Sequence, residues 1–257
     1  MRRNNVKRLF ALFVAVALLA SGVARARQAS AVRVDGSIAL ASLVSLAEGH
    51  LRAVSDSLGA LAATPTAQSA DWSAISGPLA AVAKMNVAGV YFFATSDGTY
   101  WTTASGRQPV TVADRAYFKA ALAGHVTMGE LVRSKSTGKE VATIAVPVVG
   151  ANGKVVGVLG AAVFLDALSA LLVREMHLGT GVAFFAVNEK IVIALHSDPT
   201  NIFLEPSKMS PELDAVGRKM IENDSGVQTY TYRGKLRTML FTRSALTGWR
   251  FGFGVVR

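Results

Sequence analysis

The sequence predicts an α+β fold in which a long N-terminal helix is followed by two related modules, each an antiparallel sheet with flanking helices. Its 257 residues are 51% apolar and only 17% charged, the opposite of the balance in disordered chains. Apolar residues recur first at helical spacing and then, from residue 89, in β-branched and aromatic runs. The hexapeptide Gly89–Ala94 returns 92 residues later as Gly181–Ala186, with five of six residues identical. This repeat favours two copies of one module over a single long sheet.

The N-terminal segment has the pattern of an export signal. Residues 1–8 are basic, Leu9–Ala20 is an unbroken apolar run, and Ala24-Arg25-Ala26 matches an A-x-A cleavage site. We therefore predict a signal peptide over residues 1–26 and an extracytoplasmic mature protein, in the bacterial periplasm or secreted. The alternative is an uncleaved inner-membrane anchor formed by residues 9–24, although these 16 residues fall short of the roughly 20 that a spanning helix needs.

Charge and side-chain inventory exclude several function classes. The formal net charge is +10, but five of the basic residues lie in the first 26 positions, so the rest is only mildly basic and we expect no nucleic-acid partner. The chain has no cysteine, which excludes disulfides and thiolate chemistry. No phosphate loop, serine-nucleophile or zinc-protease motif occurs, and the four histidines lack metal-ligand spacing. We therefore predict no enzyme, no cofactor and no metal site.

Helices are predicted where apolar residues recur at three- and four-residue steps, which happens over Val32–Thr64, Trp72–Lys84, Asp114–Leu122 and Asp166–His177. Thr64-Pro65 ends the first of them, because proline cannot continue a helix. Asp114 or Thr111 is the expected cap of the third.

Strands are predicted where β-branched and aromatic residues lie between turn signals. In the first copy these segments are Gly89–Thr95, Tyr100–Thr103, Val141–Val149 and Val155–Phe164. In the second copy they are Gly181–Ala186, Ile191–Leu195 and a closing pair within Leu236–Val256. We therefore place the long helix at residues 32–64, the first module at residues 72–170 and the second module at residues 171–257.

Four passages follow one another in a characteristic order. They are Asp114–Ala121, Arg133–Gly138, Ile144–Pro147 with the glycine-rich Gly153–Gly160, and the closing Gly248–Gly254. Read together, they resemble the extracytoplasmic double Cache sensor domain over about residues 32–257. The resemblance implies a long N-terminal helix spanning two PAS-like modules, the first membrane-distal and the second membrane-proximal. This agrees with the internal repeat.

The resemblance also implies a mode of action. A small molecule would bind in the distal module and shift the long helix, and a membrane sensor kinase or chemoreceptor would be the partner that receives the signal. In most family members a transmembrane helix and an output domain follow the proximal module. Here the chain stops at Arg257, so we expect a free-standing module. A homodimer through the long helix is a further expectation, although Val32–Thr64 shows no clear coiled-coil seam.

The ligand class follows from a comparison with amino-acid-binding members, in which an Arg-x-Trp-Tyr run holds the ligand carboxylate. The matching residues here are Arg115, which keeps the guanidinium fork, Tyr117, which keeps an aromatic hydroxyl, and Phe118, which loses one. The Tyr and the Asp that hold the ammonium group in those members fall at about Val110 and Ala162. The resemblance therefore implies a small carboxylate or other anion.

Further residues are expected around the same pocket. Tyr91, Tyr100 and Trp101 lie on the hairpin that should form its wall, and Ser134, with Ser136 and Thr137, lies on the loop above it. Each has a plainer alternative: core packing for the aromatic residues and an ordinary turn for the hydroxyl residues.

Two single residues, and the function as a whole, also have alternative interpretations. Arg115 could form a surface ion pair with Asp114 or Glu130, and His196, at a strand end of the second module, could be a structural histidine. The sequence thus predicts an extracytoplasmic module that senses a small anion. The alternative is a structural or interaction protein with a Cache fold and a degenerate pocket, which the missing ammonium partners favour.

Overall fold

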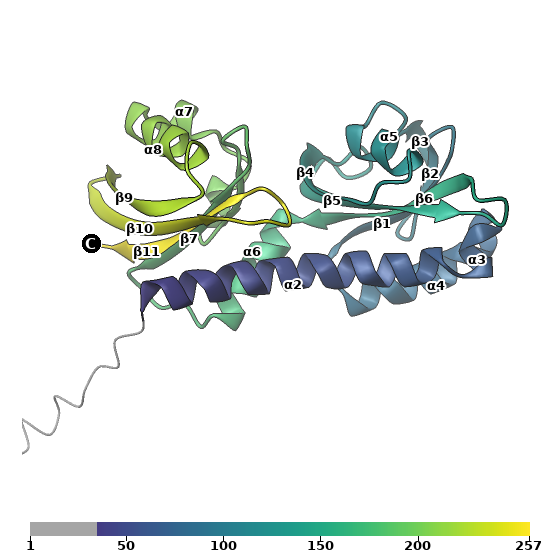
Figure 1. The fold of residues 1–257 in the computed structure, drawn as a ribbon, viewed down its shortest axis with the longest axis horizontal. Coiled ribbons are helices and arrows are strands. Elements are labelled where there is room, and N and C mark those ends of the chain that lie inside the picture. Colours follow the sequence, from purple (N-terminus) through teal and green to yellow (C-terminus); the bar gives the residue numbers. More distant parts are fainter. Residues whose placement is uncertain (1–34) are drawn as a thin grey trace, which may run out of the picture. The chain divides into compact units, whose positions relative to one another are not determined.

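Two antiparallel sheets lie along one long helix in the computed structural model, which describes residues 35–257 (Figure 1). Helices also cover the opposite face of each sheet, so the predicted α+β class and the order of helix and modules are confirmed. We call residues 72–170 the distal module and residues 171–257 the proximal module. The predicted signal peptide and the alternative anchor lie outside the described residues.

The long helix α2 runs over Gly36–Ala62, within the range predicted for it. At 1.5 Å per residue its 27 residues extend about 40 Å. Its buried residues recur at three- and four-residue steps and form one stripe: Leu40, Leu43, Ala47, Leu51, Val54, Leu58, Leu61 and Ala62. The chain then turns at Thr64, whose Oγ1 accepts the Ala67 N–H at 3.2 Å and caps the short helix α3 (Pro65–Gln68).

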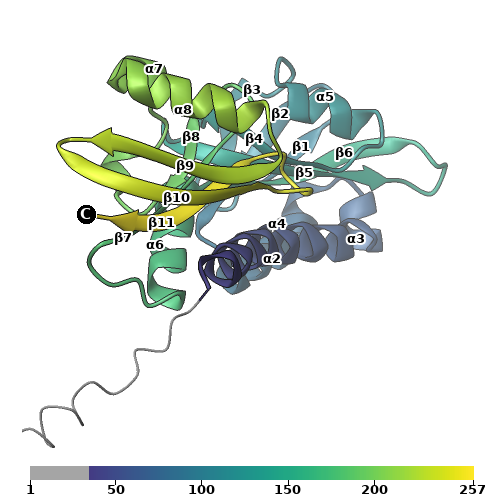
Figure 2. The same ribbon diagram turned by 60° about the vertical axis from the view of Figure 1, so that its left-hand side comes forward.

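The distal sheet has the order β3-β2-β1-β6-β5-β4, with every neighbouring pair antiparallel. Its strands are β1 (Gly89–Thr95), β2 (Thr99–Thr102), β3 (Gly106–Thr111), β4 (Thr127–Arg133), β5 (Glu140–Val149) and β6 (Val155–Phe164). Helices α2 and α4 (Trp72–Met85) lie on one side of this sheet, and α5 (Ala116–Leu122) lies on the other (Figures 1 and 2).

Alternation along the strands decides which side chains face which helix. On β1, Tyr91 and Phe93 pack in the core that includes α2, whereas Phe92 packs with residues of α5. The register Ala94↔Tyr100 and Phe93↔Trp101 carries the same alternation to β2. Tyr100 therefore lies on the α5 side, and Trp101 lies on the α2 side.

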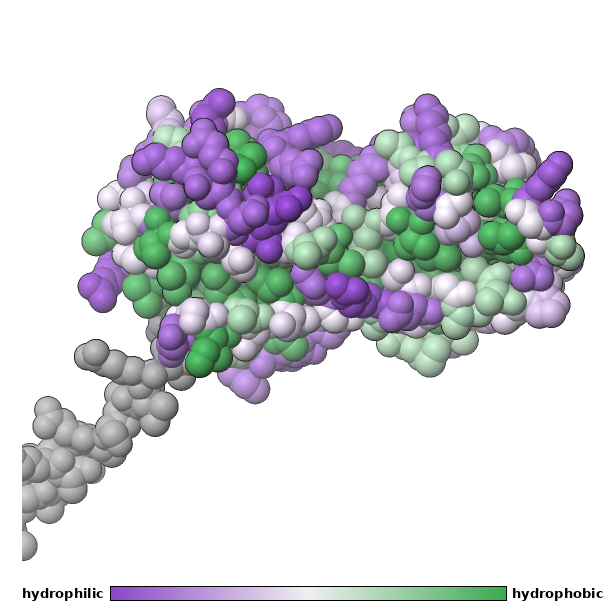
Figure 3. Space-filling view, viewed as in Figure 1, coloured by the Kyte–Doolittle hydropathy of each residue, from purple (hydrophilic) through white to green (hydrophobic). Residues whose placement is uncertain are grey.

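Helix α6 (Leu165–Glu175) leads into the proximal sheet, which has the order β8-β7-β11-β10-β9. Its strands are β7 (Val182–Val187), β8 (Ile193–His196), β9 (Ser225–Tyr232), β10 (Lys235–Arg243) and β11 (Arg250–Val256). A 3-10 turn (Pro199–Asn201), α7 (Pro206–Met209) and α8 (Pro211–Ile221) follow β8, and the two helices cover the face away from α2. Hydrophilic residues gather on the outside of this helical cover (Figure 3).

The structure corrects several details of the prediction. Helix α5 starts at Ala116 with Arg115 as its N-cap, so neither Asp114 nor Thr111 caps it. One N–H group of the first turn has a partner on β4 instead, because Glu130 Oε2 accepts the Tyr117 N–H at 2.9 Å. Strands β3, β4 and β9 and helices α7 and α8 were not predicted.

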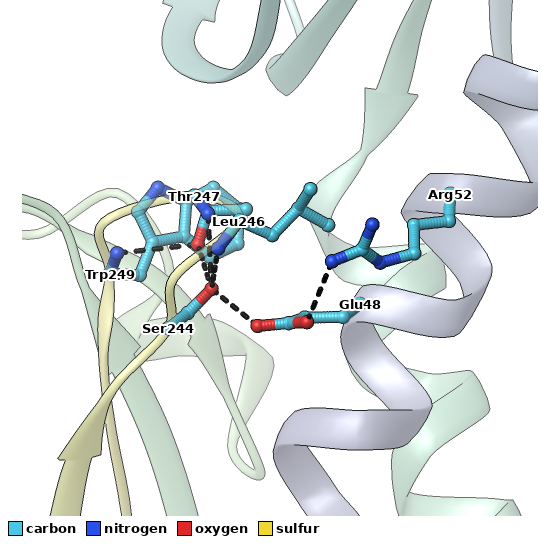
Figure 4. Close-up of polar contacts among 6 residues, drawn as sticks. All are labelled: Glu48, Arg52, Ser244, Leu246, Thr247 and Trp249. Atoms are coloured by element: carbon cyan, nitrogen blue, oxygen red, sulfur yellow. Dashed lines mark hydrogen bonds and ion pairs between the residues drawn. The ribbon is translucent and has the colours of Figure 1, made fainter.

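A turn of the proximal module connects it to α2 and to the distal module. Ser244, just after β10, donates from Oγ to Glu48 Oε1 of α2 at 2.8 Å and accepts the N–H groups of Leu246 and Thr247 (Figure 4). Five residues further on, Trp249 Nε1–H donates to the carbonyl of Gly129 on β4 at 3.1 Å. No helix within residues 35–257 is long and apolar enough to cross a membrane.

Candidate functional site

A small cavity in the distal module lies between the α5 side of the sheet and the turn that follows β4. Its volume is about 20 Å³, which is room for one or two water molecules. The sheet contributes mostly apolar residues to its lining, and α5 and the turn contribute most of the polar ones. The lining residues are Val90, Phe92, Tyr100, Val112, Arg115, Tyr117, Val132, Arg133, Ser134, Lys135, Ser136, Val141, Thr143 and Ala162.

The charges at this cavity are all positive, since its lining contains three cationic side chains and no carboxylate. Two of the cations already have acidic partners: Lys135 Nζ lies 2.5 Å from Asp114 Oδ1, and Arg133 Nη2 lies 2.8 Å from Glu140 Oε1. Arg115 donates from Nη2 only to a neutral group, the carbonyl of Arg133, at 2.9 Å. Within residues 35–257 no carboxylate lies in ion-pair range of Arg115, so the surface ion pair considered for it is not formed.

Two tyrosines place hydroxyl-bearing rings beside this guanidinium. Tyr117 is the second residue of α5, and Tyr100 comes from β2 across the cavity. Burial raises the pKa of both hydroxyls, and the Arg115 charge opposes that rise. Both rings therefore present neutral hydroxyls at neutral pH, and these can donate to an anion.

The structure brings four of the seven proposed site residues together and separates three. Arg115, Tyr117, Tyr100 and Ser134 line the cavity, as does Ser136. Phe118 is buried in the core between α5 and the sheet and does not line it.

Tyr91 and Trp101 lie on the other face of the sheet. The Tyr91 hydroxyl donates to the Val87 carbonyl at 2.8 Å, and Trp101 stacks on Trp72 with ring centroids 6.4 Å apart. Both side chains are fixed in the α2 core, because the one-residue alternation of a strand sends each neighbour to the opposite face. We therefore leave these two residues and Phe118 out of the proposed site.

The two positions aligned with the ammonium-binding residues also differ in whether they line the cavity. Ala162 lines the cavity at the place where the resemblance expects an Asp, whereas Val110 is exposed and lies outside the lining. Lys135, Arg133 and Thr143 line the cavity without having been predicted. The sequence held a signal for two of them, since Arg133 and Lys135 flank Ser134 in the loop expected above the pocket. Two cations beside a hydroxyl residue could have indicated a binding site for an anion.

The family model described as Cache domain matches residues 24–256, which is most of the chain. The chain belongs to the double Cache family. A search of curated protein sequences found no significant match. Within the described residues, no group of three or more His, Asp or Glu side chains could hold a metal ion.

Solved structures show the same double Cache fold. An extracellular ligand-binding receptor from Desulfohalobium retbaense matches with a TM-score of 0.68 and 14% identity; the match covers 86% of this chain but only 40% of the receptor chain. The ligand-binding domain of the Pseudomonas aeruginosa amino acid chemoreceptor PctC, in complex with GABA, has a TM-score of 0.63 and 23% identity, covering 86% of this chain and 95% of that one.

The ligand-binding domain of the Pseudomonas fluorescens chemoreceptor CtaA, in complex with L-alanine, has a TM-score of 0.63 and 20% identity, covering 86% of this chain and 94% of that one. Extracellular domains assigned to histidine kinases also share the fold. At these identities the likeness establishes the fold, which is that of extracytoplasmic sensor domains.

Proposed function

We propose that this double Cache chain is an extracytoplasmic sensor module that binds a small carboxylate or other anion in its distal module. One observation carries the proposal: the distal cavity is lined by three cations and no carboxylate, and Arg115 among them has only a carbonyl as its partner. A guanidinium in this state can release a neutral acceptor and form a charge-assisted, bidentate pair with a carboxylate.

The absence of a carboxylate from the lining also supports a ligand without an ammonium group. Ala162 occupies the position where an Asp is expected, and Asp114 and Glu140 are held by Lys135 and Arg133. PctC and CtaA bind the amino acids GABA and L-alanine, which carry an ammonium group. The proposed ligand of this chain differs from those ligands in lacking that group.

Entry of a ligand requires the turn at residues 134–138 to move outward, since about 20 Å³ is less than an acetate ion needs. This turn is fastened to the start of α5 by Lys135, which contacts Asp114 and the Thr111 carbonyl. Asp114 is largely exposed, and exposed ion pairs contribute only about 0–1 kcal/mol. The ion pair between Lys135 and Asp114 therefore adds little to the free energy needed to open the turn.

Signal output requires a partner, and a membrane sensor kinase or chemoreceptor is the class that the structural neighbours support. Helix α2 is the element suited to carry the signal, because it packs against strands of both sheets. Pairing of two copies through α2 is part of this proposal.

A thermal-shift screen of small carboxylates, phosphate, amines and amino acids on the full chain tests the ligand class, because a ligand that binds only the folded state raises Tm. Calorimetry with Arg115→Ala should then show roughly 10- to 150-fold weaker binding, the value of one charge-assisted hydrogen bond. Arg115→Lys should recover only part of the affinity. Arg107→Ala is the matched control, since Arg107 lies on the neighbouring strand β3 and outside the lining.

The size of the distal cavity favours one other candidate, an interaction protein whose pocket has closed. If Arg115→Ala binds the anion as tightly as wild type does, the distal cavity is not the binding site. A screen in which no carboxylate or phosphate raises Tm would favour the interaction protein.

A further inference from the structure

The proximal module contains a second cavity, which is larger than the distal one. Its volume is about 50 Å³, and it lies between the sheet and the helices α7 and α8. Most of its wall is apolar, with Phe185, Val187 and Ile193 on the sheet and Met209, Val216 and Met220 on the helices. Gly217, His196, Tyr230, Tyr232 and Arg237 also line the cavity.

Arg237 is the unexpected member of this wall. It lies on β10 at an inward position of the strand, and the next two inward positions are the buried residues Met239 and Phe241. Its Nε is buried without a hydrogen-bond partner, and no carboxylate in the described part of the chain lies in ion-pair range of its guanidinium. An unpaired buried donor is costly, especially on a charged group. A bound anion would remove that cost.

Aromatic contacts hold the Arg237 guanidinium in place. Its Cζ lies 5.3 Å from the centre of the Tyr232 ring, and Arg233 lies 5.1 Å from the same ring. Tyr232 can therefore orient Arg237 through a cation–π contact without neutralising it. Such a contact leaves the N–H groups available to a ligand.

Two uncharged polar groups lie beside Arg237. Burial raises the pKa of Tyr230 to about 12, and burial, with Arg237 contributing, lowers the pKa of His196 to about 4. Both side chains are therefore neutral at neutral pH. Since His196 Nδ1 accepts the Asp198 N–H at 2.8 Å, the neutral ring carries its proton on Nε2. The cavity thus holds one formal charge, and that charge is positive.

We propose that the proximal cavity is a second binding site, specific for a short-chain monocarboxylate whose carboxylate pairs with Arg237 and whose alkyl group fills the apolar wall. A water-sized group needs about 10–15 Å³, so 50 Å³ corresponds to roughly three to five non-hydrogen atoms, a range that includes acetate and propionate. A dianion such as phosphate would meet only one cation in this lining, Arg237. A protonated amine would be repelled by the positive charge of Arg237.

This site is independent of the distal one. The two cavities share no lining residue, and their single unpaired arginines come from different modules. The proposal therefore goes beyond the proposed distal function, and either site can fail without the other.

The experiment is calorimetric titration of the full chain with sodium propionate up to millimolar concentrations, with propionamide as its uncharged isostere. We expect propionate to bind and propionamide to bind at least tenfold more weakly. Arg237→Met, which keeps an unbranched apolar chain of similar length, should weaken propionate binding roughly 10- to 150-fold. Arg243→Met is the matched control, because Arg243 is an exposed residue of the same strand.

Two further variants keep the test decisive if Arg237→Met folds poorly. Val216→Phe adds bulk to α8 inside the cavity and should abolish propionate binding at the proximal site, while leaving Arg237 and the distal cavity in place. Arg115→Ala should leave the proximal affinity unchanged. The proposal is overturned if propionate does not bind or if propionamide binds equally well. It is also overturned if Arg237→Met and Val216→Phe bind propionate as wild type does, or if Arg115→Ala alone removes binding.

Discussion

Trp249 of the proximal module donates its indole N–H to the carbonyl of Gly129 in the distal module, at 3.1 Å. Both residues are buried. Gly129 has φ = 89° at an irregularity in β4, and a Cβ there would lie 3.1 Å from Thr247. The following residue, Glu130, holds the first turn of α5 beside the distal cavity. The hydrogen bond between the two modules and the hydrogen bond that caps α5 at the proposed site are therefore made by neighbouring residues, Gly129 and Glu130.

This contact yields a prediction about stability. Trp249→Phe removes the indole N–H and leaves the Gly129 carbonyl buried without its partner, so the free energy of unfolding should fall by about 1–3 kcal/mol. Denaturant unfolding followed by circular dichroism measures it. Trp101→Phe is the control, since the Trp101 indole N–H has no hydrogen-bond partner among the described residues. Equal losses in the two variants would show that ring size, not the hydrogen bond, sets the effect.

Ser244 and Glu48 give a second prediction, for the contact between α2 and the proximal turn (Figure 4). Ser244→Ala should destabilise the chain by about 1–3 kcal/mol, because the buried hydroxyl is both a donor to Glu48 and an acceptor within its own turn. Arg52→Ala should change stability by less than about 0.5 kcal/mol, because Arg52 is exposed and lies 3.5 Å from Glu48.

A double-mutant cycle with Ser244→Ala and Glu48→Ala isolates the interaction between these two side chains, because each variant removes one partner of the hydrogen bond. We expect a coupling energy of about 1 kcal/mol. Strict additivity would mean that the turn, and not its link to α2, accounts for the loss in Ser244→Ala.

The internal hexapeptide repeat predicted the two modules because it marks corresponding interior strands, β1 in the distal sheet and β7 in the proximal sheet. The missed strands β3, β4 and β9 are all edge strands, and most residues of β3 and β9 are exposed. Such strands are held by backbone pairing to a neighbour and need little apolar alternation. Their sequence therefore looks like that of a loop.

The sequence predicted only part of the distal site, because a motif shows which residues matter but not which face of a strand each side chain occupies. Arg115 and Tyr117 follow from their motif, whereas Tyr91 and Tyr100 both belong to a hairpin and only the strand register decides that they face opposite sides. The proximal cavity had one available signal, the charged Arg237 at a strand position that alternates with Met239 and Phe241. The remaining lining residues are scattered from residue 185 to residue 232 and form no motif.

Ala162 gives a third prediction, on ligand class in the distal module. Ala162→Asp places a carboxylate in the cavity lining, which should shift preference towards ligands that carry an ammonium group beside their carboxylate. The ratio of glycine affinity to acetate affinity should rise roughly 10- to 150-fold relative to Ala162→Asn, which has the same shape without the charge. Titration of both variants with both ligands measures it. Equal ratios would place Ala162 away from the bound ligand.

The last prediction concerns His196, whose pKa burial lowers from 6.5 to about 4. Between these two values the unfolded chain binds a proton at this histidine and the folded chain does not, so protons favour unfolding. The His196 contribution to stability is therefore complete above about pH 6.5 and is lost as the pH falls towards 4. A shift of this size corresponds to roughly 3–4 kcal/mol, since one pKa unit is worth about 1.4 kcal/mol.

Unfolding free energies of wild type and His196→Asn across this pH range test the assignment. Asn keeps an oxygen near the position of Nδ1, so it can still accept the Asp198 N–H, but it does not titrate. The difference between the two proteins should grow from near neutral pH downwards in favour of His196→Asn. His125→Asn, at an exposed position, controls for the loss of a histidine as such. Parallel pH profiles for wild type and His196→Asn would mean that the His196 ring is open to protons in the folded chain.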